Sequence, residues 1–148
     1  NGFGVPLSAS VDCWDIIVNE MCRQVAMDRR IIIRSAGHAW RNFVPVPDVV
    51  RALGVSAVDL PAGTYNLGSP QSMTLRQLAD RVAEVCHATL GFSPSVSTGT
   101  TVRGESYPAW TYDIQKLAVG GFAPSASFDE EVERTLRMAQ QAFGVASQ

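Results

Sequence analysis

The sequence contains one pair of residues spaced for proton-transfer chemistry, Tyr112 and Lys116, which form a Tyr-x-x-x-Lys string. A tyrosine acts in proton transfer when a neighbouring lysine and a bound cofactor lower its pKa. No Gly-x-x-Gly-x-x-Gly string occurs in the 148 residues, so the chain lacks the turn that places a pyrophosphate at a helix N-terminus. We therefore expect the Tyr-x-x-x-Lys spacing to be coincidental and assign no catalytic residue to this chain.

The histidines and cysteines lack the spacing of a metal or redox site. His38 and His87 are far apart in the sequence, and we expect each to be exposed or half-buried. Cys13 and Cys22 fall on opposite faces of one expected helix and cannot pair with each other. Neither they nor Cys86 stand in a Cys-x-x-Cys string. We expect buried, unreactive thiols in a reducing cytoplasm, and no metal.

Composition indicates one globular domain without a nucleic-acid surface. Hydrophobic residues make up 46% of the chain and charged residues 18%, which is typical of a folded protein. The net charge is −2 and the basic residues are dispersed, which argues against nucleic-acid binding. No apolar run approaches the roughly 18 residues that span a bilayer, and the first residues are not those of a signal peptide. The chain begins without methionine, and we expect an upstream part to be missing.

Apolar residues at helical spacing and capping signals predict five helices that must position any site. Two of them carry a capping box, Thr74 with Gln77 and Ser127 with Glu130. The expected ranges are 11–28 with Ser10 as N-cap, 47–53 ended by Gly54, 75–90 ended by Gly91, 113–119 ended by Gly120, and 128–143.

Short β-branched or extended segments predict strands at 31–34, 43–46, 64–67, 95–98 and 109–112. These strands are few and scattered among the helices, whereas a self-sufficient α/β domain shows several strong strands in βαβ succession. The pattern is typical of a lobe that completes a sheet belonging to another part of the protein.

Four segments, in order and over nearly the whole chain, resemble the second half of the extended short-chain dehydrogenase/reductases. This family includes NAD-dependent nucleotide-sugar epimerases, dehydratases and decarboxylases. The segments are Asn1-Gly2-Phe3-Gly4-Val5-Pro6, similar to N-x-Y-G-P; Arg41-Asn42-Phe43-Val44-Pro45-Val46-Pro47-Asp48-Val49, similar to R-D-F-I-x-V-x-D-V; Tyr65-Asn66-Leu67-Gly68-Ser69, similar to Y-N-I-G-S; and Arg103-Gly104-Glu105 with Tyr112 to Leu117 and Gly121-Phe122-Ala123-Pro124, similar to R-x-G-D, D-x-S-K-A and L-G-W-x-P.

The chain departs from these motifs at Asn42, where the family usually has Asp, and at Gln115, where it usually has Ser. Pro45 and Pro47 also occupy a segment that is normally poor in proline. The departures bear on the subfamily.

The resemblance implies an α/β fold, the carboxy-terminal substrate-binding lobe of a Rossmann-type enzyme, with short strands among about five helices. Residues 1–148 would form this lobe, and segments 1–10 and 43–68 would pack on a missing amino-terminal Rossmann domain.

The resemblance also implies four substrate-binding residues. Arg41 would contact the diphosphate or nucleoside, because a guanidinium offers bidentate donors and stays charged. Arg103 would close over the phosphates, Asn1 would contact sugar or phosphate, and Trp40 could stack on a base. The alternatives are a surface ion pair such as Arg41 with Asp48, a solvated loop charge at Arg103, and plain packing of Trp40.

Two functions remain open at this point. The resemblance implies half of an NAD- or NADP-dependent oxidoreductase, an isomerase or lyase of carbohydrate biosynthesis acting on a sugar nucleotide. Its missing half would hold the cofactor and carry out hydride and Tyr-assisted proton transfer, and the intact enzyme would be a cytoplasmic homodimer. The isolated chain would then be inactive. The alternative is a stand-alone, non-catalytic module that binds nucleotide sugars or mediates assembly.

Overall fold

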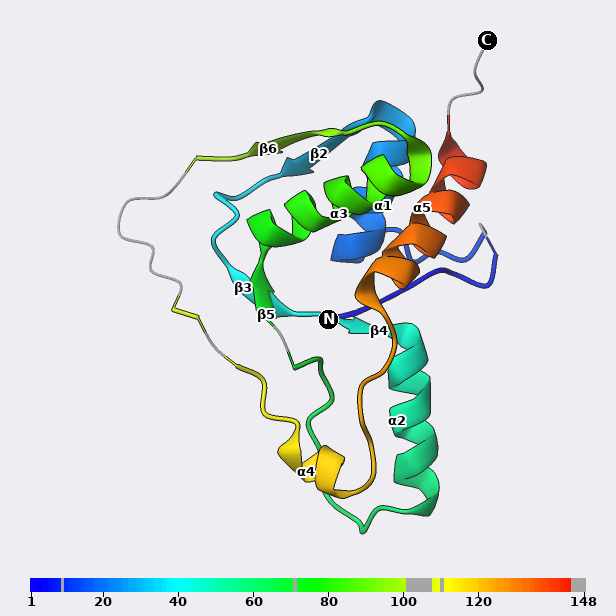
Figure 1. The fold of residues 1–148 in the computed structure, drawn as a ribbon, viewed down its shortest axis with the longest axis vertical. Coiled ribbons are helices and arrows are strands. Elements are labelled where there is room, and N and C mark those ends of the chain that lie inside the picture. The colour runs from blue at the N-terminus through cyan, green and yellow to red at the C-terminus, as the bar shows by residue number, and fades with distance from the viewer. Residues whose placement is uncertain (9, 71, 101–107, 110, 145–148) are drawn as a thin grey trace.

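The computed structural model describes residues 1–8, 10–70, 72–100, 108–109 and 111–144. In these residues five helices stand among short strands, as expected for an α/β lobe (Figure 1). The helices are α1 (Ile17–Asp28), α2 (Val46–Val58), α3 (Leu75–Leu90), α4 (Gln115–Val119) and α5 (Phe128–Phe143).

Helices α1, α3 and α5 pack against one another and form the main body of the molecule (Figure 1). Their apolar faces meet in one core, because apolar residues at helical spacing line one side of each helix. On α5 the inner residues Val132, Leu136 and Ala139 are fully buried. Burial of these faces removes apolar surface from water and stabilises the body.

The strands of the described residues pair two by two. Strands β1 (Gly2–Phe3) and β4 (Val44–Pro45) are parallel, as are β2 (Arg30–Ile33) and β6 (Ser95–Thr98). Strands β3 (Trp40–Asn42) and β5 (Ser72–Thr74) are antiparallel. The strands predicted near 31–34, 43–46 and 95–98 are therefore confirmed, with small shifts at their ends.

The strand predicted at 64–67 is wrong, and the described part of 109–112 forms no strand either. Side chains rather than a backbone ladder hold the first of these segments. Lys116 Nζ donates to the Thr64 carbonyl oxygen at 2.7 Å, and Asn66 Nδ2 donates to the Asp113 carbonyl oxygen at 3.0 Å.

Capping at α3 is as predicted. Thr74 Oγ1 accepts from the Gln77 N–H, and Gln77 Oε1 accepts from the Thr74 N–H. Gly91, in the left-handed conformation, ends the helix. At α5 the described residues show only half of the predicted box, with Ser127 Oγ accepting from the Glu130 N–H.

Helix α1 starts at Ile17, so the prediction of a helix from residue 11 with Ser10 as its cap is wrong. Residues 11–16 turn instead, because Trp14 is buried there with its ring edge-on to Phe143, 5.0 Å between centroids. Cys13 therefore lies outside the helix and is half-buried, whereas Cys22 and Cys86 are buried as expected; all three are free thiols.

Helix α2 continues through Gly54 to Val58, so the prediction that Gly54 ends it is wrong. Glycine weakens a helix but does not forbid it. The inner side of α2 packs in a second, smaller cluster, which fixes the helix beyond that point. The buried members of the cluster are Ala52, Leu117 and Phe122, with Val55, Leu60, Tyr65 and Leu67 against them.

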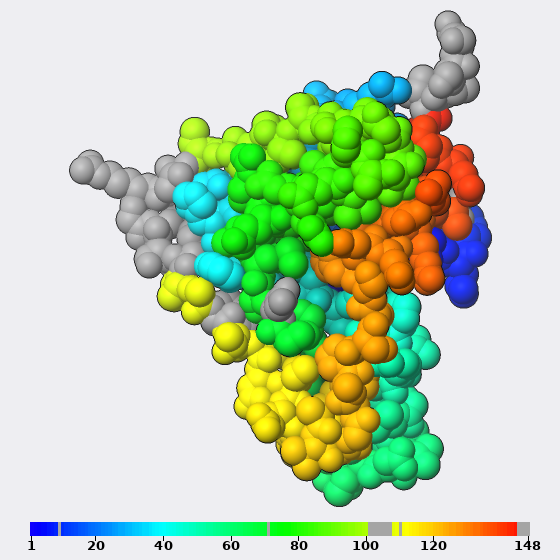
Figure 2. Space-filling view, in the orientation of Figure 1, coloured from blue at the N-terminus to red at the C-terminus, as the bar shows by residue number. Residues whose placement is uncertain are grey.

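This small cluster forms a separate lower part of the molecule, built from α2, α4 and the segments that join them (Figures 1 and 2). The side of α2 that faces away from the cluster is apolar. Val46, Val50 and Leu53, spaced along one side of the helix, are 41%, 61% and 64% exposed. We call these three residues the α2 stripe.

Candidate functional site

The pairing of β1 with β4 brings Asn1 against the segment that carries Arg41. The backbone nitrogen of Asn1 and its Nδ2 donate to the Asn42 carbonyl oxygen at 2.8 and 3.1 Å. The Val44 N–H donates to the Asn1 carbonyl oxygen at 2.9 Å. Asn1 therefore contacts the backbone of the residue that follows Arg41 in β3.

Arg41 lies at the middle of β3 with its side chain exposed. Its Nη1 donates to the Trp40 carbonyl oxygen at 2.8 Å, and it forms no ion pair within the described part of the chain. The alternative in which Arg41 pairs with Asp48 is wrong, because Asp48 is buried and pairs with Arg51 at 2.9 Å. The guanidinium of Arg41 keeps donors that can bind an anion.

Trp40 does not share a side of the strand with Arg41. Successive side chains of a strand point to opposite faces, so Trp40 lies on the side of Asn42. There Trp40 is half-buried, opposite Thr74 of β5. Packing therefore covers part of the Trp40 side chain. The strand geometry directs Trp40 and Arg41 to opposite faces, which disfavours stacking of Trp40 on a ligand bound by Arg41.

Asn42 explains one departure from the family motif. The side chain is buried, its Nδ2 donates to the Ser69 carbonyl oxygen at 2.9 Å, and its Oδ1 accepts from the Ser69 N–H at 2.8 Å. An ionised carboxylate has no donor for that carbonyl. Asn42 thus fixes the loop at Ser69 to β3 and holds the backbone next to Arg41.

A pocket of about 290 Å³ opens beside Asn1. Its apolar walls come from the start of α1 and from Phe43, and two polar residues, Asn1 and Asp15, line it as well. The sequence interpretation missed Asp15, because nothing in its local pattern indicates that residues 13–16 turn back toward β1. The lining residues are Asn1, Gly2, Asp15, Ile16, Ile17, Val18 and Phe43.

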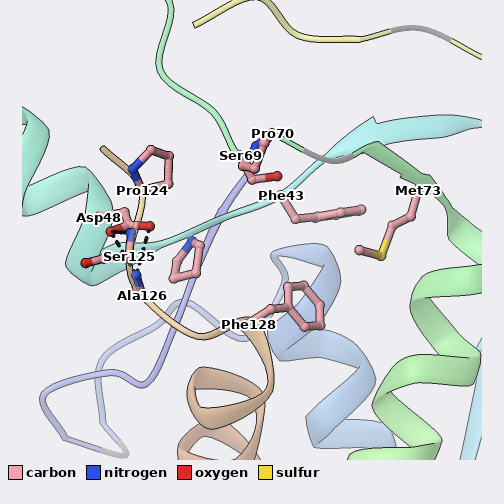
Figure 3. Close-up of a pocket in the computed structure, with 10 residues that line it drawn as sticks. Phe43, Asp48, Ser69, Pro70, Met73, Pro124, Ser125, Ala126 and Phe128 are labelled. Atoms are coloured by element: carbon pink, nitrogen blue, oxygen red, sulfur yellow. Dashed lines mark hydrogen bonds between the residues drawn. The ribbon is translucent and has the colours of Figure 1, made fainter. Parts of the chain in front are cut away.

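A second pocket, of about 360 Å³, also borders on Phe43 and is lined largely by proline and apolar side chains (Figure 3). Asp48 lies at its edge and accepts hydrogen bonds from the Ser125 and Ala126 N–H groups at 3.2 and 3.1 Å. Its contacts with these groups and with Arg51 occupy the carboxylate. Asp48 is thus a structural carboxylate in the first turn of α2.

Two buried polar side chains fix the loop that follows β1. Asn19 exchanges hydrogen bonds with the Gly4 backbone at 3.4 and 2.9 Å, and Glu131 Oε1 accepts from the Val5 N–H at 2.9 Å. A Cβ at Gly4 would lie 2.5 Å from that Glu131 oxygen, so a side chain there would displace the Glu131 carboxylate. Glu131, in the first turn of α5, therefore fixes the loop that follows β1.

The Lys116 ammonium group contacts Thr64 and Tyr65 rather than Tyr112. Its Nζ bonds to the Thr64 carbonyl oxygen and lies 4.4 Å from the centroid of the Tyr65 ring. This agrees with a coincidental Tyr-x-x-x-Lys spacing. Arg103, the remaining predicted binding residue, lies outside the described residues.

Within the described ranges, no group of three or more His, Cys, Asp and Glu side chains is arranged to hold a metal ion. In the same ranges, none of the helices has both the length and the apolar character needed to cross a membrane.

No protein-family model matches the sequence, and no curated protein matches it. Solved structures do share its fold. UDP-glucose 4-epimerase from Thermus thermophilus, in complex with NAD, is 21% identical with a TM-score of 0.71, over 95% of this chain and 44% of that one. UDP-glucuronic acid 4-epimerase from Bacillus cereus, in complex with UDP-glucuronic acid and NAD, is 17% identical with a TM-score of 0.72, over 95% and 43%. The NAD-dependent NDP-hexosamine 5,6-dehydratase TunA of tunicamycin biosynthesis is 20% identical with a TM-score of 0.70, over 95% and 43%.

The chain thus spans less than half the length of these enzymes. Almost all of it superposes on them, and the predicted resemblance in fold is confirmed. The chain has the α/β fold of part of the Rossmann-type nucleotide-sugar epimerases and dehydratases.

Proposed function

We propose that this chain is the substrate-binding lobe of an NAD- or NADP-dependent oxidoreductase that acts on a sugar nucleotide, a member of the extended short-chain dehydrogenase/reductases. The observation that carries the proposal is that Asn1 contacts the backbone of Asn42, next to Arg41, whose exposed guanidinium forms no ion pair among the described residues. The shared fold over 95% of the chain and the four motifs in family order support it.

The lobe binds the nucleotide part of the substrate. Arg41 grips the diphosphate, because a guanidinium donates two parallel hydrogen bonds to phosphate oxygens. Arg103 closes over the same phosphates, and Asn1 contacts the sugar or phosphate. Trp40 borders the site and contributes chiefly through packing.

The residues of this chain do not fit the cofactor, since no glycine-rich strand–turn–helix occurs in the sequence. The cofactor and the catalytic pair therefore belong to a separate amino-terminal Rossmann half, and the isolated lobe is inactive. Epimerisation and dehydration begin with hydride transfer from the sugar to the cofactor, and reduction is hydride transfer in the opposite direction, so an isomerase, a lyase and a reductase are all compatible with this lobe. The intact enzyme is a homodimer of carbohydrate biosynthesis in the cytoplasm.

Segments 1–10 and 43–68 pack on that Rossmann half. Two features support this. The α2 stripe exposes Val46, Val50 and Leu53, apolar surface that a packed domain interface would cover. Strands β1 and β4 form a parallel pair of two residues each, and parallel strands are normally buried inside larger sheets.

Substitution of Arg41 tests the proposal. In the intact enzyme, Arg41→Ala should weaken nucleotide-sugar binding by about 1.5–3 kcal/mol, the range for a hydrogen bond to a charged group. Isothermal titration calorimetry measures this directly. Arg137→Ala is the control, because Arg137 pairs with Glu133 on α5 and should leave the affinity unchanged. Equal affinity in the Arg41 variant would remove Arg41 from the site.

The stand-alone binding module is the second candidate, and the mass of the native protein separates the two. A native protein well above the 15.9 kDa of this chain, or a co-purifying partner with a glycine-rich strand–turn–helix, supports the enzyme half. A homogeneous species of the chain's own mass from an untruncated gene supports the module.

A further inference from the structure

Asn42 connects the segments that surround Arg41. Its Nδ2 donates to the Ser69 carbonyl oxygen at 2.9 Å and to Ser72 Oγ at 3.3 Å, and its Oδ1 accepts from the Ser69 N–H at 2.8 Å. Its backbone carbonyl oxygen accepts from Asn1. The strand that carries Arg41 is thus fixed both to the loop before β5 and to the segment of Asn1.

The Asn42 side chain has little room to change these partners. It is 5% exposed, and a Cβ added at Gly68 would lie 2.5 Å from its Oδ1 and 2.7 Å from Tyr112 Cδ1. The charged or titratable groups that the described residues place around it are Arg41 on its own strand, Tyr112 beside Gly68 and the nitrogen of Asn1. The amide itself has no proton to lose near neutral pH, so its hydrogen bonds do not depend on pH.

A carboxyl group of the same shape would behave differently. Asn42→Asp would place an oxygen against the Ser69 carbonyl oxygen, to which the amide nitrogen now donates. The protonated acid can donate there, whereas the ionised form only accepts. Burial and the facing carbonyl would both raise the pKa of this carboxyl above its ordinary value of about 3.9. The contact would therefore be kept at low pH and lost as the pH rises through the raised pKa.

We propose that Asn42 is a positioning residue for Arg41, and that its amide keeps diphosphate binding free of the pH dependence that an aspartate there would bring. Asn42 acts through the backbone of β3, because Arg41 directly precedes it and the guanidinium bonds to the Trp40 carbonyl oxygen of the same strand. Movement of β3 away from the Ser69 loop would move the guanidinium as well. This inference rests on the proposed function, because it requires Arg41 to bind the diphosphate.

Binding of sugar nucleotides to the intact protein tests the inference. UDP-glucose, dTDP-glucose and GDP-mannose are titrated into the parent protein by isothermal titration calorimetry. The tightest binder is then titrated into Asn42→Asp and Asn42→Ala at about pH 5 and pH 8. Because variant and parent share every other ionisable group, the ratio of their dissociation constants isolates position 42. Thermal unfolding under the same conditions records the stability of each protein.

Gln24→Glu is the matched control. The Gln24 amide also holds the backbone of a strand, since its Oε1 accepts from the Ile32 N–H of β2 at 2.7 Å. The substitution again turns an amide into a carboxyl group, but on a strand other than that of Arg41. It should leave the affinity for the sugar nucleotide equal to that of the parent at both pH values.

Relative to the parent, Asn42→Asp should bind about equally at the lower pH and about three- to tenfold more weakly at the higher pH, the effect of roughly one lost buried hydrogen bond. Asn42→Asp should also take up a proton on binding, which appears as a heat that varies with the ionisation enthalpy of the buffer. Asn42→Ala should bind more weakly than the parent at both pH values.

An affinity of Asn42→Asp that keeps the same ratio to the parent at both pH values overturns the inference, even if the variant is less stable. That result leaves the proposed function standing, which Arg41→Ala tests separately. If Asn42→Asp unfolds at the higher pH, proton uptake on binding near about pH 6 supports the inference and its absence overturns it. If none of the three sugar nucleotides binds the parent, the proposed function fails together with the inference.

Discussion

At position 42 the side-chain amide nitrogen of asparagine makes a hydrogen bond that an ionised aspartate could not make. The amide of Asn42 supplies one donor and one acceptor to Ser69, and both groups are held within 3 Å. The family motif usually has a carboxylate here, which accepts from the N–H but leaves the Ser69 carbonyl without a donor. A residue that looks like a weak match in sequence is therefore the one that completes this pair of hydrogen bonds.

The buried thiols of Cys22 and Cys86 make the stability depend on pH. Burial raises the pKa of the Cys86 thiol to about 11, and it raises the pKa of Cys22 further. Because the folded state keeps these protons to higher pH than the unfolded state, whose thiols titrate near 9.0, their contribution to stability is complete below about pH 9. The Cys86 contribution is lost as the pH rises toward 11, and the Cys22 contribution continues to fall at higher pH.

We therefore expect the urea midpoint of the chain to fall between pH 9 and pH 10.5. Cys86→Ala should show a shallower fall, because one of the two titrating groups is gone. A midpoint that stays constant over this range in the parent chain would show that the two thiols are not shielded from water.

At the scale of elements, replacement of glycine by alanine should have opposite effects in helix α2 and in the loop before β5. Gly54 lies inside α2 with nothing within 4 Å of an added Cβ. Gly68 lies in the loop before β5, where an added Cβ would come within 2.5 Å of Asn42 Oδ1 and 2.7 Å of Tyr112 Cδ1.

Gly54→Ala should raise the free energy of unfolding by about 0.5–1 kcal/mol, because alanine loses less backbone entropy in a helix. Gly68→Ala should lower it by about 1–3 kcal/mol, the cost of forcing an added methyl group into packed structure. Urea unfolding of the two variants measures both values. The same sign for both substitutions would contradict the packing described at Gly68.

Helix α2 is tied to the segment before α5 by Asp48. The carboxylate accepts from the Ser125 and Ala126 N–H groups, and Arg51, which pairs with it, also donates to the Ala123 carbonyl oxygen and to Ser125 Oγ. Asp48 and Arg51 therefore tie α2 to the segment that leads into α5.

Asp48→Ala should destabilise the chain by about 1.5–3 kcal/mol, because the Ser125 and Ala126 N–H groups and the Arg51 guanidinium lose a buried, charged acceptor. Asp59→Ala is the control, since Asp59 is exposed at the end of the same helix. Thermal or urea unfolding measures the difference between the variants. Equal stability of the two would show that the Asp48 contacts contribute little.

At the scale of the whole molecule, the two hydrophobic clusters differ in how fully the surrounding helices enclose them. The body of α1, α3 and α5 encloses its core, whereas α2 covers the small cluster with one side and exposes the α2 stripe on the other. An exposed apolar stripe of this kind is typical of a surface that packs against another surface. It supports our proposal that a further domain covers α2.

Leu53→Glu tests the role of the α2 stripe. In the intact protein it should lower the free energy of unfolding by about 1–3 kcal/mol, because a buried contact is replaced by a charge. In the isolated 148-residue chain it should have almost no effect, since Leu53 is exposed there. Ala88→Glu, at an exposed position of α3, serves as the control in both proteins. A similar response of the intact protein to both substitutions would exclude a covered α2 stripe.

The sequence by itself determined the features that depend on neighbours a few residues away. The Thr74–Gln77 capping box, the stop at Gly91 and the inner face of α5 follow from hydrogen bonds and side-chain repeats within one or two turns. The sequence did not predict the helix ends that tertiary contacts decide. Residues 11–16 form turns rather than helix because Trp14 is buried there. Helix α2 continues past Gly54 because its inner side packs in the small cluster.

Only the tertiary structure decided how the site is assembled. The Glu131 contact that fixes the loop after β1 joins groups 126 positions apart, and the Asp48 contact with Ala126 spans 78. Asn1 meets Asn42 across 41 positions, and Asp15 reaches the same pocket only because the chain turns back before α1. Contacts over such separations leave no periodic trace in the sequence, because they depend on how whole elements pack rather than on local spacing.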